Sequence, residues 1–401
     1  MIRINTKINL IHYCCYMYML IALSPLLDYY ANWYIVAIPI IILAIHLIRK
    51  KSQLQKVMAL FLLAICLSLI QSLGIYTASN IVDRLINDVI NWSSGLIALY
   101  FSILENKNQK EFIKKFLQVT IIIFGITSIT TIIGLNVYPN AARELASGTA
   151  IYDTTIYSRK NIGGYSFIYS SVLLIPVLVW VIKKYTSFFK YSSIVVLVIN
   201  LYCIYQSQYT IAIILAVIIL LLTLFAKNIK RFCTLFASVM LFILCGGTSF
   251  LGNIILKISN FISFDYVADR MLQLSLLLRG LSIKTETTTE RIEHYLYTFN
   301  GFLQSPIIGN VFFSNNAQMV SGHTVILDTL SAIGVIGLII VSMIYVRTYR
   351  LFLRNKKIGF NSFMCLFSFV LLSLVNPSNF TIVFFVIFVC VVAMEKLNDT
   401  I

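Results

Sequence analysis

Long apolar runs alternate with short polar segments along this whole chain. Runs of about twenty apolar residues recur, each long enough to cross a hydrocarbon core of about 30 Å as a helix. Lipid offers backbone groups no hydrogen-bond partner, so these runs are predicted to be helical. The pattern predicts about twelve spans, near residues 10–27, 29–48, 57–76, 86–104, 116–137, 165–182, 191–206, 209–226, 232–254, 323–346, 359–375 and 380–394.

The predicted fold class is therefore all-α, a polytopic transmembrane helical bundle that makes residues 1–401 a single integral-membrane domain. Two connecting segments are longer than the rest, residues 138–164 and residues 255–322. Both segments follow odd-numbered spans, the fifth and the ninth, so they lie on the same side of the membrane, and the even number of spans places the two termini together on the other side. Chemistry or recognition is therefore expected on the side of the two long segments.

The large loop 255–322 is predicted to be partly helical. Residues 257–281 are sparsely charged and are expected to lie in the outer interface, either as a lid packed on the spans or as a guide for a substrate. A helix over about 288–303 is expected next. One of its faces is polar and aromatic, and the other, predicted to be buried, holds Ile292, Leu296, Phe299 and Leu303.

Composition and charge support this interpretation. Hydrophobic residues make up 59% of the chain and charged residues 11%, with a mean hydropathy of +0.88. The net charge of +16 comes mostly from lysines and arginines in the short loops on one side, which the positive-inside rule makes cytoplasmic, with both termini. Nucleic-acid binding is not predicted, because that would need a basic face on a soluble surface.

The sequence predicts no cofactor and no metal site. The eight cysteines all lie inside apolar runs without paired spacing, so neither a disulfide framework nor a metal site is expected. The short loops contain no phosphate-binding glycine motif, which argues against ATP-driven transport. The first apolar run is kept as a span because no small-residue cleavage site follows it.

Candidate chemistry is concentrated in the large loop. Arg291 and His294 lie on the polar face of the predicted helix 288–303; they are either solvated surface groups or ligands of an anion, for which the permanent charge of Arg291 is suited. His323 stands where the loop enters the next span. Partial desolvation there lowers the pKa of a histidine and keeps it neutral, as a general base requires, whereas the plainer alternative is an interfacial histidine bonded to nearby backbone.

The shorter loop carries a second basic cluster, Arg143, Arg159 and Lys160. These residues either contact lipid headgroups or bind a diphosphate together with Arg291. Inside the span after His323, Asp328 is expected to pair with a neighbouring span, since it points away from His323 on an ideal helix. Gly334 and Gly337 are expected to let another helix pack closely.

These residues resemble the bacterial O-antigen polymerase and ligase superfamily. The resemblance rests on Arg291, residues 305–310 (SPIIGN), residues 322–337 (GHTVILDTLSAIGVIG) and the hairpin 374–380 (LVNPSNF), and covers roughly the last third of the chain. The chain departs from the family at residues 206–210 (QSQYT), which contain no arginine, and at residues 310–311, which lack a second glycine.

The resemblance implies a metal-independent membrane glycosyltransferase in the bacterial cytoplasmic (inner) membrane that acts on undecaprenyl-diphosphate-linked oligosaccharide at the periplasmic face. It implies that His323 is the base or orienting residue and that Arg291 holds the diphosphate, with Arg159 as the first helper and Arg143, Lys160 and His294 as further contacts. Membrane lipid is an expected partner in any case. Whether a polysaccharide chain-length regulator also binds is left open by the sequence.

Three functions remain open on the sequence. A polymerase would transfer the growing glycan onto the next lipid-linked repeat unit, and a ligase would transfer finished glycan to another acceptor such as lipid A core. A flippase or other secondary transporter of the same substrate belongs to a different class, in which ionisable residues and broken helices lie near the bilayer midplane. The polymerase is the favoured interpretation.

Overall fold

The computed structural model describes residues 6–31, 33–48, 51–72, 78–147, 154–226, 228–262, 264–281, 286–311, 320–354 and 356–398, and its regular elements are all helices. In chain order they are α1 (Thr6–Leu23), α2 (Pro25–Tyr30), α3 (Trp33–Leu47), α4 (Lys51–Ser72), α5 (Ala78–Ile103), α6 (Lys107–Val137), α7 (Ala141–Ser147), α8 (Thr154–Arg159), α9 (Tyr165–Lys184), α10 (Phe188–Gln206), α11 (Thr210–Phe225), α12 (Ile229–Phe242), α13 (Thr248–Ser259), α14 (Asp265–Leu278), α15 (Glu286–Gln304), α16 (Val325–Phe352), α17 (Phe360–Val375), α18 (Thr381–Phe384) and α19 (Val391–Asn398). Two π-helical stretches, Ile243–Gly247 and Phe385–Cys390, join α12 to α13 and α18 to α19.

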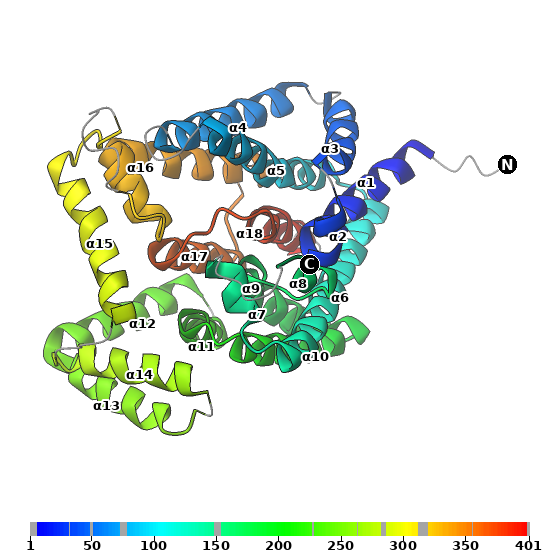
Figure 1. Cartoon of the computed structure of the whole chain (residues 1–401). Helices are drawn as coiled ribbons and strands as arrows, with labels where there is room; N and C mark the ends of the chain where they lie inside the picture. The colour runs from blue at the N-terminus through cyan, green and yellow to red at the C-terminus, as the bar shows by residue number, and fades with distance from the viewer. Residues whose placement is uncertain are drawn as a thin grey trace.

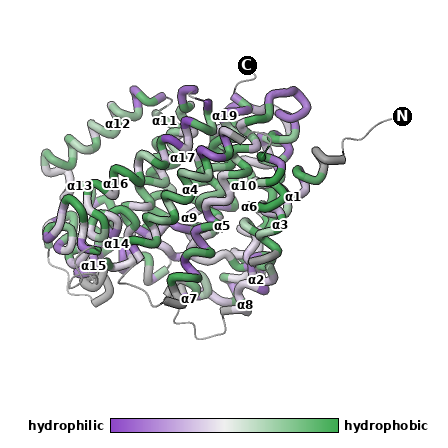
Figure 2. Tube along the Cα trace, turned by 90° about the horizontal axis from the view of Figure 1, so that it is seen from above, coloured by the Kyte–Doolittle hydropathy of each residue, from purple (hydrophilic) through white to green (hydrophobic). Residues whose placement is uncertain are grey.

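The helices fit a membrane protein. Among the described residues, seven helices are long and apolar enough to cross a membrane, and four shorter apolar helices accompany them. Each segment that the sequence marked as a span falls on a helix, which confirms the all-α class. Figure 2 shows a green apolar band across the bundle, with hydrophilic segments gathered towards its two ends.

The core lies around α9 and the last helices of the chain. In the most apolar stretch of α9, 83% of the residues are buried inside the protein. The corresponding share is 78% for the segment Thr381–Asn398 and 11% for Ile229–Ser259. Figure 1 accordingly places α9, α17 and α18 in the middle of the molecule, with α12, α13 and α14 at one edge. Side chains on the peripheral helices are exposed because lipid, not protein, is expected to cover them.

Hydrogen bonds hold the loops in place at the two opposite ends of the bundle. At the end that we call inner, Lys184 Nζ donates to the carbonyl oxygen of Leu397 at 2.6 Å, and Lys183 Nζ donates to that of Thr223 at 3.0 Å. At the opposite end, called outer, Ser24 Oγ donates to Asn161 Oδ1 at 3.0 Å. Figure 2 places α2, α7, α8, α14 and α15 at the outer end and the C-terminus at the inner end.

The large loop is helical, as predicted, but its first part differs from the prediction. Instead of one interfacial helix over 257–281, α13 ends at Ser259 and α14 begins at Asp265. The two helices pack against each other, and Gly252 on α13 allows close contact, since an added Cβ would lie 2.9 Å from the carbonyl oxygen of Ser275. The apolar side of α14 therefore packs partly against α13 and partly faces the surroundings of the protein.

The apolar face of α15 is exposed, contrary to the prediction. Leu296, Phe299 and Leu303, expected to be buried, are 54%, 43% and 56% exposed, whereas Thr298 on the polar face is fully buried. The physical reason is the solvent: a helix beside a membrane turns its apolar face to lipid and its polar face towards protein. His294, for which a solvated position was one interpretation, is exposed, and the side chain of Arg291 lies outside the described residues.

Candidate functional site

The structure brings two of the nominated residues together at the outer end. The rings of His294, on α15, and His323, in the loop before α16, have their centroids 4.6 Å apart and their planes inclined by 49°. The hydroxyl of Tyr295 donates to the carbonyl oxygen of Val375 at 3.1 Å and so anchors α15 to the end of α17. Sequence reasoning gave His294 the weakest nomination, yet it lies against His323.

Arg291 lies one helical turn before His294. Its backbone belongs to α15, as that of His294 does. Its side chain, like that of Arg143, lies outside the described residues. The proposed grip of Arg291 on a diphosphate therefore remains a prediction, supported by its position in the chain.

Asp328 holds the loop that carries His323. Its Oδ1 accepts hydrogen bonds from the backbone N–H and the hydroxyl of Ser321 at 3.2 and 3.3 Å, and its Oδ2 accepts one from the N–H of Thr324 at 3.2 Å. A carboxylate in the first turn of α16 also satisfies free N–H groups and complements the helix dipole. The expectation of a partner on a neighbouring span was wrong; Asp328 caps its own helix and positions the loop.

A break in α16 supports the same region. Gly334 has φ +67° and ψ −171°, a conformation close to glycine-only, inside an otherwise helical segment. Residues 306–311 fill the break: Asn310 N donates to Ser331 O at 2.9 Å, and Val335 N donates to Pro306 O at 2.9 Å. Backbone groups that the break frees are thereby satisfied, as a membrane requires.

Gly334 thus serves a different purpose from the predicted one. A Cβ at Gly334 would lie 2.3 Å from the carbonyl oxygen of Ile307, and one at Gly309 would lie 2.2 Å from that of Ala332. The two glycines let two non-helical backbone segments meet. At Gly337 the three atoms nearest to an added Cβ all belong to Ile333 of the same helix. The SPIIGN segment is consequently a structural brace between α15 and α16.

A cavity of about 470 Å³ opens beside the loop that carries His323. Its walls come from the first half of α5, the start of α16, the loop residues Ser321, Gly322 and Thr324, and the hairpin 377–380. This volume falls in the range of about 300–1,000 Å³ that small-molecule sites occupy. Four lining residues, Gln71, Asp88, Val325 and Asn379, also line a smaller, more apolar cavity of about 150 Å³ deeper in the bundle.

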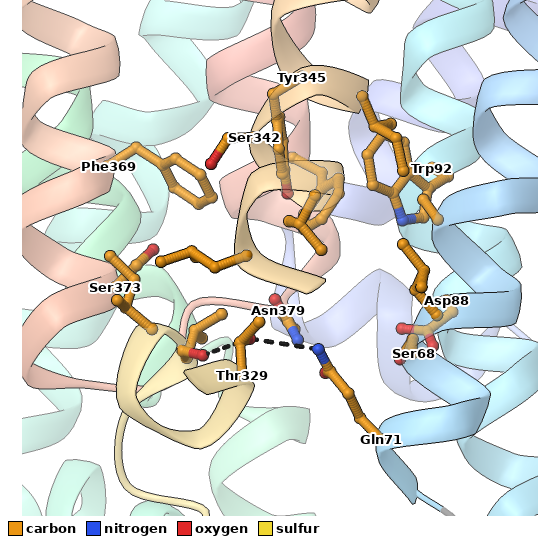
Figure 3. Close-up of a pocket in the computed structure, with 18 of the residues that line it drawn as sticks. Ser68, Gln71, Asp88, Trp92, Thr329, Ser342, Tyr345, Phe369, Ser373 and Asn379 are labelled. Atoms are coloured by element: carbon orange, nitrogen blue, oxygen red, sulfur yellow. Dashed lines mark hydrogen bonds between the residues drawn. The ribbon is translucent and has the colours of Figure 1, made fainter. Parts of the chain in front are cut away.

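Figure 3 shows this deeper cavity between α4, α5, α16 and α17, with Trp92 and Tyr345 at one end. Gln71 Nε2 donates to Thr329 Oγ1 at 3.2 Å across it. On the hairpin side, Asn91 Nδ2 donates to Asn379 O at 3.2 Å and Thr381 Oγ1 donates to Asn91 Oδ1 at 2.7 Å. These bonds fix α5 to the hairpin and give the two cavities a common polar wall.

Asp88 is the residue that sequence reasoning missed. It lines both cavities, is only 6% exposed, and its Oδ2 has no hydrogen-bond partner. Ser68 hydrogen-bonds to the carboxylate and accepts a bond from Arg84 Nε at 3.3 Å. The signal was present in the sequence, because Asp88 is an ionisable residue inside the predicted span 86–104, where such residues usually have a function.

The first outer loop is placed elsewhere. Arg159 donates to the hydroxyl of Tyr29 at 2.9 Å with its guanidinium 5.2 Å from the ring, and Lys160 donates to that of Tyr138 at 2.9 Å. Both side chains are exposed, and α8 packs on α2. Figures 1 and 2 both put α8 and α15 in different parts of the outer end. The structure therefore gives no convergence of Arg159 or Lys160 with His323.

Comparison with known proteins adds no relative: no protein-family model, curated protein or solved structure matches the chain. Within the described ranges, no group of three or more histidine, cysteine, aspartate or glutamate side chains is placed to hold a metal ion. The candidate site is thus defined by geometry, as the pair His294–His323 and the adjoining cavity under α5.

Proposed function

We propose that this protein is a membrane glycosyltransferase that polymerises polysaccharide repeat units at the outer end of its helical bundle. The observation that carries the proposal is the contact between His294 and His323, 4.6 Å between ring centroids, beside a cavity of about 470 Å³. The substrate would be oligosaccharide linked to undecaprenyl diphosphate, reaching the site from the bilayer of a bacterial cytoplasmic membrane crossed about twelve times. Both chain termini would then be cytoplasmic.

The reaction requires side chains in two roles. An acceptor hydroxyl must be oriented and lose its proton as it attacks the sugar carbon that carries the diphosphate. The bond from that carbon to the diphosphate oxygen breaks, and negative charge on the departing diphosphate must be stabilised. A pair of imidazoles suits these two roles, because one ring can accept the hydroxyl proton while the other donates a hydrogen bond.

We assign binding of the diphosphate to Arg291. An arginine keeps its charge at physiological pH and can bond two phosphate oxygens at once. Its place one turn before His294 on α15 would set the diphosphate against the histidine pair. Arg159 and Lys160 are left out of the reaction, because their side chains bond tyrosines in another part of the outer end. Arg143, whose side chain lies outside the described residues, stays a predicted substrate contact.

A gel of surface polysaccharide tests this assignment in cells whose glycan depends on the chain. For a polymerase, His323→Ala or Arg291→Ala should leave core carrying a single repeat unit. For a ligase, the same changes should remove every core-linked unit while long glycan accumulates on the lipid carrier. A normal ladder from both variants at normal protein level would reject the site.

A matched control comes from the other end of the bundle. His46 lies on α3 with its ring 5.7 Å from that of Tyr100, far along the chain from the outer loops. His46→Ala should therefore retain the full ladder at equal protein level. Loss of the ladder in this control would show that removing any imidazole harms the protein.

Transport of the same lipid-linked glycan is the second candidate, and the cavities favour it. A third cavity, lined by Tyr349, Arg350 and Lys356 towards the inner end, shares Ser342, Tyr345, Phe369 and Val370 with the deeper cavity. Together with the broken helix α16 and the buried Asp88, this row of cavities resembles the features of transporters. In a transport-deficient Asp88→Asn strain, lipid-linked single units would stay on the cytoplasmic leaflet and no core would be modified.

A further inference from the structure

The cavity under α5 has a chemistry of its own, separate from the histidine pair. Its outer part presents three carboxylates, Asp83, Asp88 and Asp328, and one guanidinium, Arg84. Amide side chains of Gln71, Asn87 and Asn91 complete the polar wall. The formal charge of this wall is negative, so a diphosphate would be repelled from it.

Two buried polar atoms of the described residues in this wall, Asp88 Oδ2 and Thr324 Oγ1, lack a hydrogen-bond partner. The carboxylate of Asp328 is occupied by backbone and hydroxyl donors of its own loop. By contrast Asp88 Oδ2 has no donor although the side chain is 94% covered by protein, a costly state that a ligand hydroxyl or ammonium would relieve.

A hydroxyl-rich neutral ligand fits these surroundings best. Carboxylates accept hydrogen bonds from hydroxyl groups, amides both accept and donate them, and an aromatic ring packs against the apolar C–H face of a sugar. Trp92, on α5 one turn beyond Asp88, lines the deeper part of the same space, and Figure 3 shows both side chains facing it.

We propose that the two adjoining cavities that share Asp88, the outer one lined by Asn91 and the deeper one by Trp92, bind a neutral sugar residue, with Asp88 Oδ2 accepting a hydrogen bond from a ring hydroxyl. This assignment rests on the proposed function, in which a glycan acceptor must be held close to His323. Residues 320–322 and 324, on either side of His323 in the chain, line the outer cavity, so the sugar bound here would belong to the acceptor glycan. Asp88 is then a substrate-binding residue, and Trp92 determines which sugar face is accepted.

Tryptophan fluorescence measures this binding without any reaction. The chain contains three tryptophans, so Trp33→Phe combined with Trp180→Phe leaves Trp92 as the reporter in purified full-length protein in detergent. Titration with glucose, N-acetylglucosamine, rhamnose and glucuronate covers neutral and acidic sugars. We expect saturable quenching by at least one neutral sugar in the millimolar range, and at least tenfold weaker binding of glucuronate.

Replacing the carboxylate should then weaken binding selectively. In the same background, Asp88→Asn keeps the side-chain shape and should raise the dissociation constant about tenfold, as loss of a charged hydrogen bond implies. The control Asp269→Asn removes an exposed carboxylate on α14 and should bind as the parent does. An unchanged elution profile in size-exclusion chromatography confirms that both variants are folded.

Each other outcome overturns the assignment. Equal sugar binding by Asp88→Asn and its parent would exclude Asp88, and absence of quenching by all three neutral sugars would exclude a sugar site. A fluorescence response to sodium ions, lost in Asp88→Asn, with none to sugars would identify a cation site in its place. His323→Ala should bind sugar normally. The binding measurement therefore tests this inference independently of the gel that tests the catalytic site.

Discussion

Two outer loops of this protein carry similar sequence signals, yet the structure uses them differently. In the shorter loop, Arg159 and Lys160 point to the tyrosines Tyr29 and Tyr138 and remain exposed. In the larger loop, His294 and His323 meet each other across 4.6 Å, beside a cavity with a buried, incompletely bonded Asp88. Both loops contain basic residues at an outer interface, but the described cations of the shorter one bond tyrosines, whereas the larger one places two histidines together beside a cavity.

The difference separates anchoring from binding. A cation bonded to an interfacial tyrosine lies where an aromatic belt and lipid headgroups meet, which stabilises position in the membrane. A functional site instead needs groups from several elements held around a space by a rigid support. Asp328, Gly334 and the segment 306–311 supply that support for His323.

The largest expected effect contrasts the two loops directly. His323→Ala should lower the rate of glycan polymerisation by at least about 100-fold, the size typical of losing a general base, whereas Arg159→Ala should leave the rate within about twofold. The rate is measured in membranes supplied with the lipid-linked repeat unit. Equal losses from both variants would contradict the division between the loops.

The next effect concerns the brace of the larger loop. Gly334→Ala should destabilise the protein by about 3 kcal/mol or more, because the new Cβ meets the Ile307 carbonyl in a backbone conformation closed to other residues. The matched control is Gly246→Ala, where φ is +88° and nothing lies within 4 Å of the added Cβ. There the cost should be only about 1 kcal/mol. Thermal unfolding in detergent compares the two, and equal shifts would argue against the brace.

A smaller effect is expected from the loop that Asp328 holds. Asp328→Asn removes the charge that accepts the N–H groups of Ser321 and Thr324 and should cost about 2 kcal/mol. Polymerisation should slow as well, since His323 loses its support. Asp269→Asn, exposed on α14, is the control for loss of a carboxylate. Unfolding temperature and polymerisation rate should fall together; a change in neither would remove Asp328 from the positioning role.

The smallest effect belongs to the shorter loop. Tyr29→Phe removes the hydroxyl that Arg159 bonds but keeps the ring for the cation–π contact. Because the pair is exposed, stability should change by less than about 1 kcal/mol. Unfolding temperature in detergent is the measurement, and a shift as large as that of Gly334→Ala would show that this pair is structural.

The fold class could be predicted from the sequence because lipid leaves the backbone few choices. Each apolar run became a helix, and helix 288–303 was recognised within a few residues as α15. The apolar face of α15 was wrongly predicted to be buried, since the pattern of Leu296, Phe299 and Leu303 does not state whether protein or lipid covers an apolar face. The division of residues 257–281 into α13 and α14 likewise depends on tertiary contacts.

The site could be predicted only in part. His323 and His294 were found because, of the four histidines in the chain, these two lie in or directly after its largest loop. Their contact, and the distance of Arg159 from them, depends on how α8 and α15 are placed by the rest of the bundle. Asp88 was accessible to sequence reasoning as a carboxylate inside a span, but its open Oδ2 follows from α4, α16 and the hairpin 377–380 meeting around it.

The central claim is that His294 and His323 act together at the outer end of the bundle. A double-variant cycle tests it most directly, with polymerisation of the lipid-linked repeat unit measured for His294→Ala, His323→Ala and the combined variant in membranes with matched protein levels. Residues that act as a unit lose little more together than singly, so we expect the double variant to retain the rate of His323→Ala within about threefold. Losses that multiply, or a His323→Ala rate equal to that of the unaltered protein, would contradict the claim.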